Sequence, residues 1–101
     1  MKKISLIGIG KMGISNLAIA SQTPDIEVAA ICDTSMVLIK AITKNTKFIG
    51  YTDYKKMIKE VPLDGVMILV PNAYHFEITK YCLERGIHVF IEKPFTVIFI
   101  F

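Results

Sequence analysis

Residues 4–13 of the chain read ISLIGIGKMG, an apolar run that leads into a GxGxxG pattern. In such a turn Gly8 permits a tight bend, Gly10 lets a ligand approach the backbone, and Gly13 lets the next helix pack closely on the strand. The start of that helix offers free N–H groups and partial positive charge. The stretch therefore predicts a strand, a helix and, between them, a pyrophosphate-binding turn formed by Gly8, Ile9, Gly10, Lys11, Met12 and Gly13.

Outward from this turn, apolar runs of strand length alternate with segments of helix length. The predicted strands are residues 4–9, 26–32, 47–50, 65–70 and 88–91. Their continuous apolar character is typical of parallel strands that are covered by helices on both faces. Right-handed crossovers give such strands the spatial order 3-2-1-4-5. We therefore predict an α/β fold, a doubly wound parallel sheet of the Rossmann type.

The segments between these strands carry helix signals. The first helix should end before Pro24, and a long fourth helix, residues 73–85, should end at Gly86 in a left-handed cap. Thr52 or Asp53 is expected to cap a short third helix. Its inward residues are predicted to be Tyr54, Met57 and Ile58. The second helix, which extends to about residue 43, carries an apolar stripe that we expect to pack on the sheet: Val37, Leu38, Ala41 and Ile42.

An acidic residue follows the second predicted strand. Asp33 comes about twenty positions after Gly13, where a carboxylate can accept hydrogen bonds from both hydroxyls of an adenosine ribose. This arrangement favours NAD over NADP, because Thr34 and Ser35 supply no cation for an additional phosphate. The alternative reading is that Asp33 caps the helix that follows, with Thr34 sharing that role.

Polar residues also follow the fourth and fifth predicted strands. Asn72 and His75 come after Pro71 at the same predicted edge as the glycine turn, although helix capping explains Asn72 equally well. The fifth strand leads into Glu92, Lys93 and Pro94. Exposed Glu-Lys pairs are usually solvated surface, but a lysine beside a nicotinamide ring could transfer a proton or polarise a substrate. Lys93 is therefore the candidate catalytic residue.

Composition narrows the remaining classes. The 101 residues suffice for one domain, and their net charge of +3 comes from scattered lysines, which argues against a nucleic-acid partner. Cys32 and Cys82 lack metal-ligand spacing, so no metal site is expected and both are predicted core residues. The glycine motif interrupts the apolar run near the start, and no apolar stretch approaches the length of a membrane span. We expect a cytoplasmic protein without a membrane partner.

Taken together, these motifs resemble the amino-terminal domain of the Gfo/Idh/MocA oxidoreductases. The resemblance spans residues 3–96 and rests on GIGKMG, ICD, YTDYKKMI, DGVMILVPNAYHFE and CLERGIHVFIEKPF. It implies a glycine turn that holds pyrophosphate, an Asp33 that holds the adenosine ribose, and hydride transfer to or from a sugar, polyol or related carbonyl compound. It further implies that Lys93 approaches nicotinamide and substrate and that Glu92 positions the nicotinamide ribose. Pro71, Asn72, Thr34 and His75 complete the implied cofactor contacts.

The sequence departs from that family after the EKP motif. Family members continue into a second α/β domain that forms the substrate pocket, and this chain has no counterpart to it. We therefore expect a dinucleotide-binding domain, residues 1–94, with little or no turnover, and an apolar tail, residues 95–101, that looks like a truncation or an altered reading frame. We hypothesise that this tail pairs along a sheet edge or packs against a second copy, giving a homo-oligomer.

Three other readings stay open. The chain could be a stand-alone module that binds or senses nucleotide without catalysis, or a nonfunctional gene fragment. Methyltransferases that use S-adenosylmethionine also place a glycine turn after the first strand and an acid after the second, but the motifs after strands four and five do not suit them.

Overall fold

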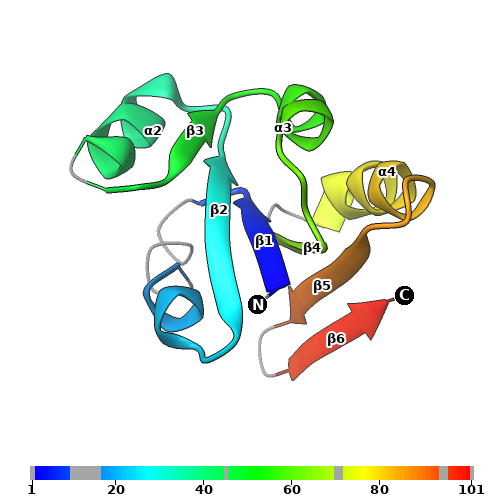
Figure 1. Cartoon of the computed structure of the whole chain (residues 1–101). Helices are drawn as coiled ribbons and strands as arrows, with labels where there is room; N and C mark the ends of the chain where they lie inside the picture. Colours follow the sequence, from blue (N-terminus) through cyan, green and yellow to red (C-terminus); the bar gives the residue numbers. More distant parts are fainter. Residues whose placement is uncertain (1, 10–16, 45, 70–71, 94–95, 101) are drawn as a thin grey trace.

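The computed structural model describes residues 2–9, 17–44, 46–69, 72–93 and 96–100, with the backbone alone described for 72–75, 91–93 and 96–100 (Figure 1). After β1 (Lys2–Ile7) comes a helical segment, residues 17–22. The remaining elements are β2 (Ile26–Cys32), α2 (Met36–Thr43), β3 (Ile49–Tyr51), α3 (Tyr54–Glu60), β4 (Gly65–Ile68), α4 (Asn72–Leu83), β5 (His88–Lys93) and β6 (Thr96–Ile100).

The strands form one sheet in the order β3-β2-β1-β4-β5-β6. The pairs β3-β2, β2-β1, β1-β4 and β4-β5 are all parallel, which confirms the predicted order 3-2-1-4-5. The sixth strand, β6, pairs antiparallel with β5 from Lys93↔Thr96 to Val89↔Ile100. The apolar tail thus pairs along a sheet edge, which is one of the two hypotheses stated for it.

Helices cover both faces of this sheet (Figure 1). One core cluster lies between the sheet, the 17–22 helix and α2, and includes Leu6, Leu17 and Ile39. The other lies between the sheet, α3 and α4, and includes Met57, Val66 and Cys82. β1 contributes side chains to both clusters, because successive residues of a strand point to opposite faces. The sheet is therefore doubly wound, and its carboxyl edge is left for the loops.

Most of the predicted boundaries are close to the observed ones. The 17–22 helix ends before Thr23, Asp53 is the N-cap of α3, and Met57 is fully buried there. Gly86 has a left-handed backbone, with φ of 72°, at the end of the turn that follows α4. Both Cys32 and Cys82 are buried, as expected for core residues.

The predicted packing face of α2 is correct for two of its four residues and wrong for the other two. Val37 is 81% exposed and Ala41 is also exposed, whereas Ile39 is the buried residue of this helix. Leu38 and Ile42 pack at the margin of the same cluster. The helix is rotated from the predicted orientation because Ile39 lies against Gly50 of β3, where the absence of a side chain leaves room for it.

Among the residues that the structure describes, no helix has the length and apolar character that crossing a bilayer requires.

Candidate functional site

The carboxyl ends of four parallel strands are joined by main-chain hydrogen bonds. The amide of Gly8, just after β1, donates to the carbonyl of Cys32 at 2.8 Å. Leu69 N, after β4, donates to the Ile7 carbonyl at 2.8 Å, and Asp33 N, after β2, donates to the Tyr51 carbonyl at 3.1 Å. The first residues of these loops are therefore held in fixed positions at one edge. In open α/β sheets this edge is where ligands bind.

The glycine turn begins with a residue that only glycine suits well. Gly8 has φ of +86°, in the left-handed region that disfavours residues with a Cβ. Its neighbour Ile9 is 2% exposed and belongs to the core cluster on the α2 side of the sheet. The buried Ile9 side chain therefore anchors the turn directly after its bend.

Asp33 reaches this turn from the end of β2. Its Oδ2 accepts a hydrogen bond from the Ile9 amide at 2.8 Å, and its Oδ1 accepts one from the Ser35 amide at 2.8 Å. The side chain is half-buried. One carboxylate thus contacts the glycine turn and the segment that leads into α2.

The N-cap of α2 is Ser35, not Asp33 or Thr34. The backbone of Ser35 is extended, and its Oγ accepts a hydrogen bond from the Leu38 amide at 3.2 Å. Thr34 is exposed. The capping alternative for Asp33 is therefore wrong, because the helix begins two residues later than that alternative required. Ser35 was noted only for its lack of charge, although Ser is among the preferred N-cap residues.

A buried thiol lies next to the acid. Burial, reinforced by the Asp33 and Asp53 carboxylates, raises the pKa of the Cys32 thiol from 9.0 to about 12. The thiol therefore stays neutral near pH 7 and is unsuited to act as a nucleophile, which requires the thiolate.

The structure describes some of the other predicted site residues by their backbone alone and leaves others outside the described residues. Gly10, Lys11, Met12, Gly13, Pro71 and Pro94 lie outside the described residues. Asn72 and His75 lie by their backbone in the first turn of α4, which follows β4, and Glu92 and Lys93 are the last two residues of β5. Because β4 and β5 are parallel, the start of α4 and the end of β5 are at the same sheet edge as Asp33.

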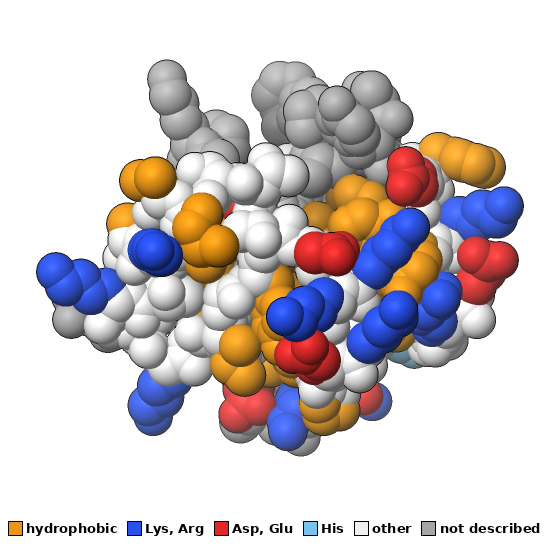
Figure 2. All heavy atoms as spheres, turned by 90° about the horizontal axis from the view of Figure 1, so that it is seen from above, with side chains coloured by type: hydrophobic (Ala, Val, Ile, Leu, Met, Phe, Trp, Pro, Cys, Tyr) orange, Lys and Arg blue, Asp and Glu red, His pale blue; other side chains and the backbone are white. Residues whose placement is uncertain are grey.

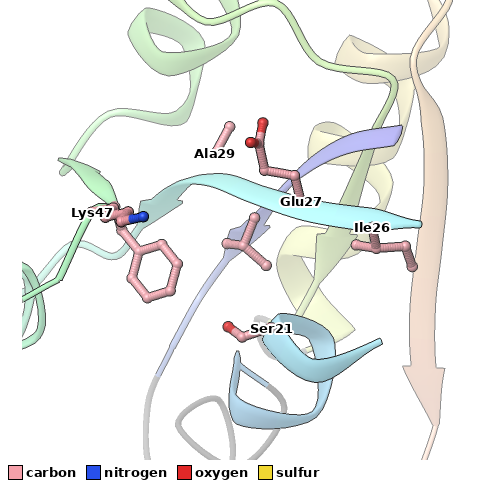
Figure 3. A pocket seen from close by; sticks show the side chains of 7 residues that line it. Ser21, Ile26, Glu27, Ala29 and Lys47 are labelled. Carbon is pink, nitrogen blue, oxygen red and sulfur yellow. The ribbon is translucent and has the colours of Figure 1, made fainter. Parts of the chain in front are cut away.

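Two hollows lie elsewhere on the described surface. One of about 440 Å³ lies at the amino end of β2, away from the glycine turn (Figure 3). It is lined by Ser21, Ile26, Glu27, Val28, Ala29, Lys47 and Phe48. The other, of about 310 Å³, lies between α3 and α4 and includes Tyr54, Phe76 and Tyr81. Neither hollow contains a predicted site residue.

The face seen in Figure 2 carries Lys and Arg side chains interspersed with Asp and Glu.

Comparison with known proteins agrees with this arrangement. Residues 2–99 match the Gfo/Idh/MocA family model, described as an oxidoreductase family with an NAD-binding Rossmann fold. The chain is similar to D-xylose 1-dehydrogenase (NADP(+)) 2 of Haloferax volcanii, with 28% identity over 92 residues, or 90% of this chain and 28% of that protein. It is also similar to D-glucoside 3-dehydrogenase of Escherichia coli, with 30% identity over 94 residues, or 91% of this chain and 27% of that protein.

Solved structures show the same similarity. Scyllo-inositol dehydrogenase from Lactobacillus casei, with bound NAD(H) and scyllo-inositol, superimposes with a TM-score of 0.83 at 26% identity. The match covers 93% of this chain and 28% of that one. Myo-inositol 2-dehydrogenase from Lactobacillus plantarum gives a TM-score of 0.80 at 28% identity, over 92% of this chain and 28% of that one. The chain thus spans little more than a quarter of the length of the relatives it matches.

Proposed function

The chain belongs to the Gfo/Idh/MocA oxidoreductase family, whose NAD-binding Rossmann domain it matches over residues 2–99, and on that premise we propose how its residues take part in hydride transfer. The turn of residues 8–13 binds the diphosphate of NAD(H), and Asp33 binds the adenosine ribose. The substrate class is a sugar, polyol or related carbonyl compound. The observation that carries this proposal is the Asp33 carboxylate, held 2.8 Å from the Ile9 amide at the glycine turn.

The geometry at Asp33 is compatible with a bound ribose. A carboxylate has two oxygens that can each accept more than one hydrogen bond, and here each of them accepts from a main-chain amide. Its position between Ile9 and the segment before α2 supports this role, because a ligand whose diphosphate lies on the glycine turn would extend past it. When bound, NAD supplies the group that accepts or donates hydride, and the protein supplies its binding and orientation.

We propose that NAD is preferred to NADP. A 2′-phosphate at Asp33 would meet a carboxylate of like charge. The Ser35 and Leu38 amides at the start of α2 already have protein acceptors, namely Asp33 Oδ1 and Ser35 Oγ. The residues that follow Asp33 in the sequence, among them Thr34, Met36 and Val37, carry no cationic side chain before Lys40. Because the Haloferax relative is named for NADP(+), affinity for both cofactors has to be measured on this chain.

We assign the residues after β4 and β5 to the nicotinamide side. Pro71, Asn72 and His75 line it, Glu92 orients the nicotinamide ribose, and Lys93 holds or transfers a proton at the reacting oxygen of the substrate. The common sheet edge of α4 and β5 supports these roles. The chain spans about a quarter of the length of its relatives, and we expect these 101 residues to bind the cofactor.

Calorimetric titration of the full chain with NAD⁺, NADH and NADP⁺ tests the proposal. We expect NAD(H) to bind more tightly than NADP⁺, and Asp33→Ala to weaken NAD⁺ binding about tenfold or more, since hydrogen bonds to a charged group contribute about 1.5–3 kcal/mol. The matched control is Asp64→Ala, because the Asp64 carboxylate also accepts a main-chain amide at 2.8 Å, that of Lys3 in β1, but directly before β4. Absence of NAD(H) binding, or equal losses in both variants, would contradict the proposal.

We further propose that the protein is cytoplasmic, that residues 1–94 form the dinucleotide-binding domain, and that the chain forms homo-oligomers through its apolar tail. The sheet supports the last point. β6 is one of the two edge strands, and its sequence TVIFI contains no charge and no proline. Natural edge strands usually carry such residues, which discourage pairing with another chain.

A further inference from the structure

The Asp33 carboxylate is bonded to two segments of the chain that are far apart in the sequence. Its two oxygens each accept one main-chain amide at 2.8 Å, from Ile9 in the glycine turn and from Ser35 before α2. We propose that Asp33 is a positioning residue, whose carboxylate fixes the start of the glycine turn, at Ile9, against the segment that leads into α2 before any ligand binds. This role deepens the proposed function and rests on it, because a fixed turn aids binding only if the turn receives a diphosphate.

The backbone of Asp33 is itself held in place. Its amide donates to the Tyr51 carbonyl at the end of β3, and the carbonyl of the preceding residue, Cys32, accepts from the Gly8 amide. A carboxylate anchored on both sides of its own backbone can restrain what it contacts. The position of Asp33 is thus set by β3 and by Gly8, directly after β1, and the Asp33 carboxylate in turn bonds to Ile9.

The glycine turn is the part that needs such a restraint. Gly8 adopts a φ of +86°, but glycine also populates many other conformations, so ordering it has an entropic cost. Directly after it, the Ile9 side chain is anchored in the core while the Ile9 amide is bonded to Asp33. Restraining a binding loop in its bound conformation raises affinity by lowering the cost of ordering it during binding.

Helix capping does not account for these bonds. Ser35 Oγ already caps α2 through the Leu38 amide, and Asp33 bonds to Ile9, which is 24 positions away in the sequence and lies in the turn after another strand, β1. The carboxylate therefore connects two loops in addition to supporting the local turn at Ser35.

The first test uses the ligand-free protein, so it does not depend on whether NAD binds. We expect Asp33→Ala to shift the Ile9 and Ser35 amide resonances upfield and to speed their hydrogen exchange, with both amides unchanged in Asp64→Ala. Asp33→Asn, which keeps one carbonyl acceptor, should restore the Ile9 resonance toward its original position. An Ile9 amide that is unaltered in Asp33→Ala, or equally altered in Asp64→Ala, overturns the proposal.

The second test separates positioning from direct contact with the ribose. The probe is 2′,3′-dideoxyadenosine 5′-diphosphate, which carries a diphosphate but lacks the ribose hydroxyls that Asp33 would bind. Because Asp33→Asn and Asp33→Ala are both uncharged, their comparison excludes a change in repulsion of the diphosphate. We expect the Asn variant to bind this probe about threefold to tenfold more tightly than the Ala variant, the range of one hydrogen bond. Equal affinities overturn the positioning role.

The two proposals fail in distinguishable ways. A chain that does not bind NAD(H), but whose Ile9 amide responds to Asp33→Ala, retains the restraint without the proposed function. A chain that binds NAD(H), but whose Ile9 amide resonance and hydrogen exchange are unchanged in Asp33→Ala, retains the function without the restraint. Thermal unfolding of each variant establishes that the compared proteins are folded.

Discussion

At the scale of single residues, the sequence located Asp33 correctly but not its contacts. Its distance from the glycine pattern predicted a carboxylate at the end of β2, where it lies. The bond to Ile9 could not be predicted, because it joins residues 24 positions apart through a loop conformation that no local pattern encodes. The choice of Ser35 as N-cap was equally hidden, since Asp33, Thr34 and Ser35 are all good cap residues and helix starts are uncertain by one or two positions.

The hydroxyl of Ser5 gives a first prediction at this scale. Ser5 is fully buried in β1, and its Oγ has no hydrogen-bond partner among the described residues. Removing an unsatisfied buried polar group relieves a desolvation penalty, so we expect Ser5→Ala to raise the free energy of unfolding by about 1 kcal/mol in urea titrations.

A matched serine serves as the control for that experiment. Ser21 Oγ donates to the Leu17 carbonyl at 2.8 Å on the exposed side of the 17–22 helix. Ser21→Ala should change the free energy of unfolding by about 0.5 kcal/mol or less, as is usual for surface substitutions. A clear loss of stability in Ser5→Ala would mean that its hydroxyl has a partner in the folded protein.

The two buried thiols predict how stability depends on alkaline pH. Burial raises the pKa of Cys32 to about 12 and that of Cys82 to about 11, whereas both are near 9.0 when exposed. Each raised pKa contributes stability that is complete below pH 9, because the native state retains a proton that the unfolded chain releases above it. We expect the free energy of unfolding to fall from about pH 9 to about pH 12 in urea titrations.

Variants identify the source of this fall. Cys32→Ala should make the decline of the free energy of unfolding shallower. Part of the decline should remain, because burial and the Glu77 carboxylate raise the pKa of Tyr54 to about 12. Iodoacetamide should react slowly with native protein at about pH 10 and rapidly in concentrated urea. Rapid alkylation of the native protein at that pH would show that the thiols are accessible.

At the scale of elements, strand order and helix positions followed from the sequence, while one packing face and one strand pairing did not. Continuous apolar runs identified the five parallel strands because such runs suit strands covered on both faces. The α2 stripe was misjudged because helical spacing allows more than one apolar face, and Ile39 was selected by its contact with Gly50 on another element. The pairing of β6 depends on the neighbouring strand, so composition alone left it as one of two hypotheses.

The contact between α2 and β3 gives a prediction at this scale. A Cβ on Gly50 would collide with Cγ2 of Ile39 and lie 3.0 Å from Cγ2 of Thr43. Overpacking of this kind costs about 1–3 kcal/mol, so Gly50→Ala should lower the midpoint of urea unfolding. Because the collision needs Cγ2 of Ile39, a double-mutant cycle with Ile39→Ala should show that the two substitutions are coupled.

Gly86 supplies the uncoupled comparison. A Cβ there meets nothing within 4 Å, but φ of +72° makes any side chain unfavourable. Gly86→Ala should therefore cost about 1–2 kcal/mol in either Ile39 background. The effects of Gly86→Ala and Ile39→Ala on the free energy of unfolding should simply add. If the effects of Gly50→Ala and Ile39→Ala also simply add, the contact with α2 does not explain the glycine at position 50.

At the scale of the whole molecule, the doubly wound architecture and the family were predictable, because they rest on many motifs that agree. The glycine turn, the acid after β2 and the motifs after β4 and β5 are far apart in the sequence, yet the topology brings their strand ends to one edge. The motifs did not predict the sixth strand of the sheet, β6, which lies at the outer edge and has the sequence TVIFI.

The edge formed by β6 gives a prediction about assembly. A lysine in an edge strand opposes pairing with another chain, because pairing would bury or juxtapose its charge. If homo-oligomers form through β6, Phe99→Lys should shift the protein toward monomer in light scattering. Ile19→Lys, at a position 66% exposed on the 17–22 helix, should leave the oligomer distribution unchanged. A wild-type chain that is monomeric at all concentrations would remove the basis for this proposal.

The central place of β1 in the sheet determines the order in which the chain can fold during synthesis. β1 is synthesised before both of its neighbours, β2 and β4, and the bond between Lys3 and Asp64 spans 61 positions. Until the ribosome has released residue 68, one side of this apolar strand has no partner. Non-local pairing of this kind slows folding, so nascent chains should depend on chaperones until β4 emerges.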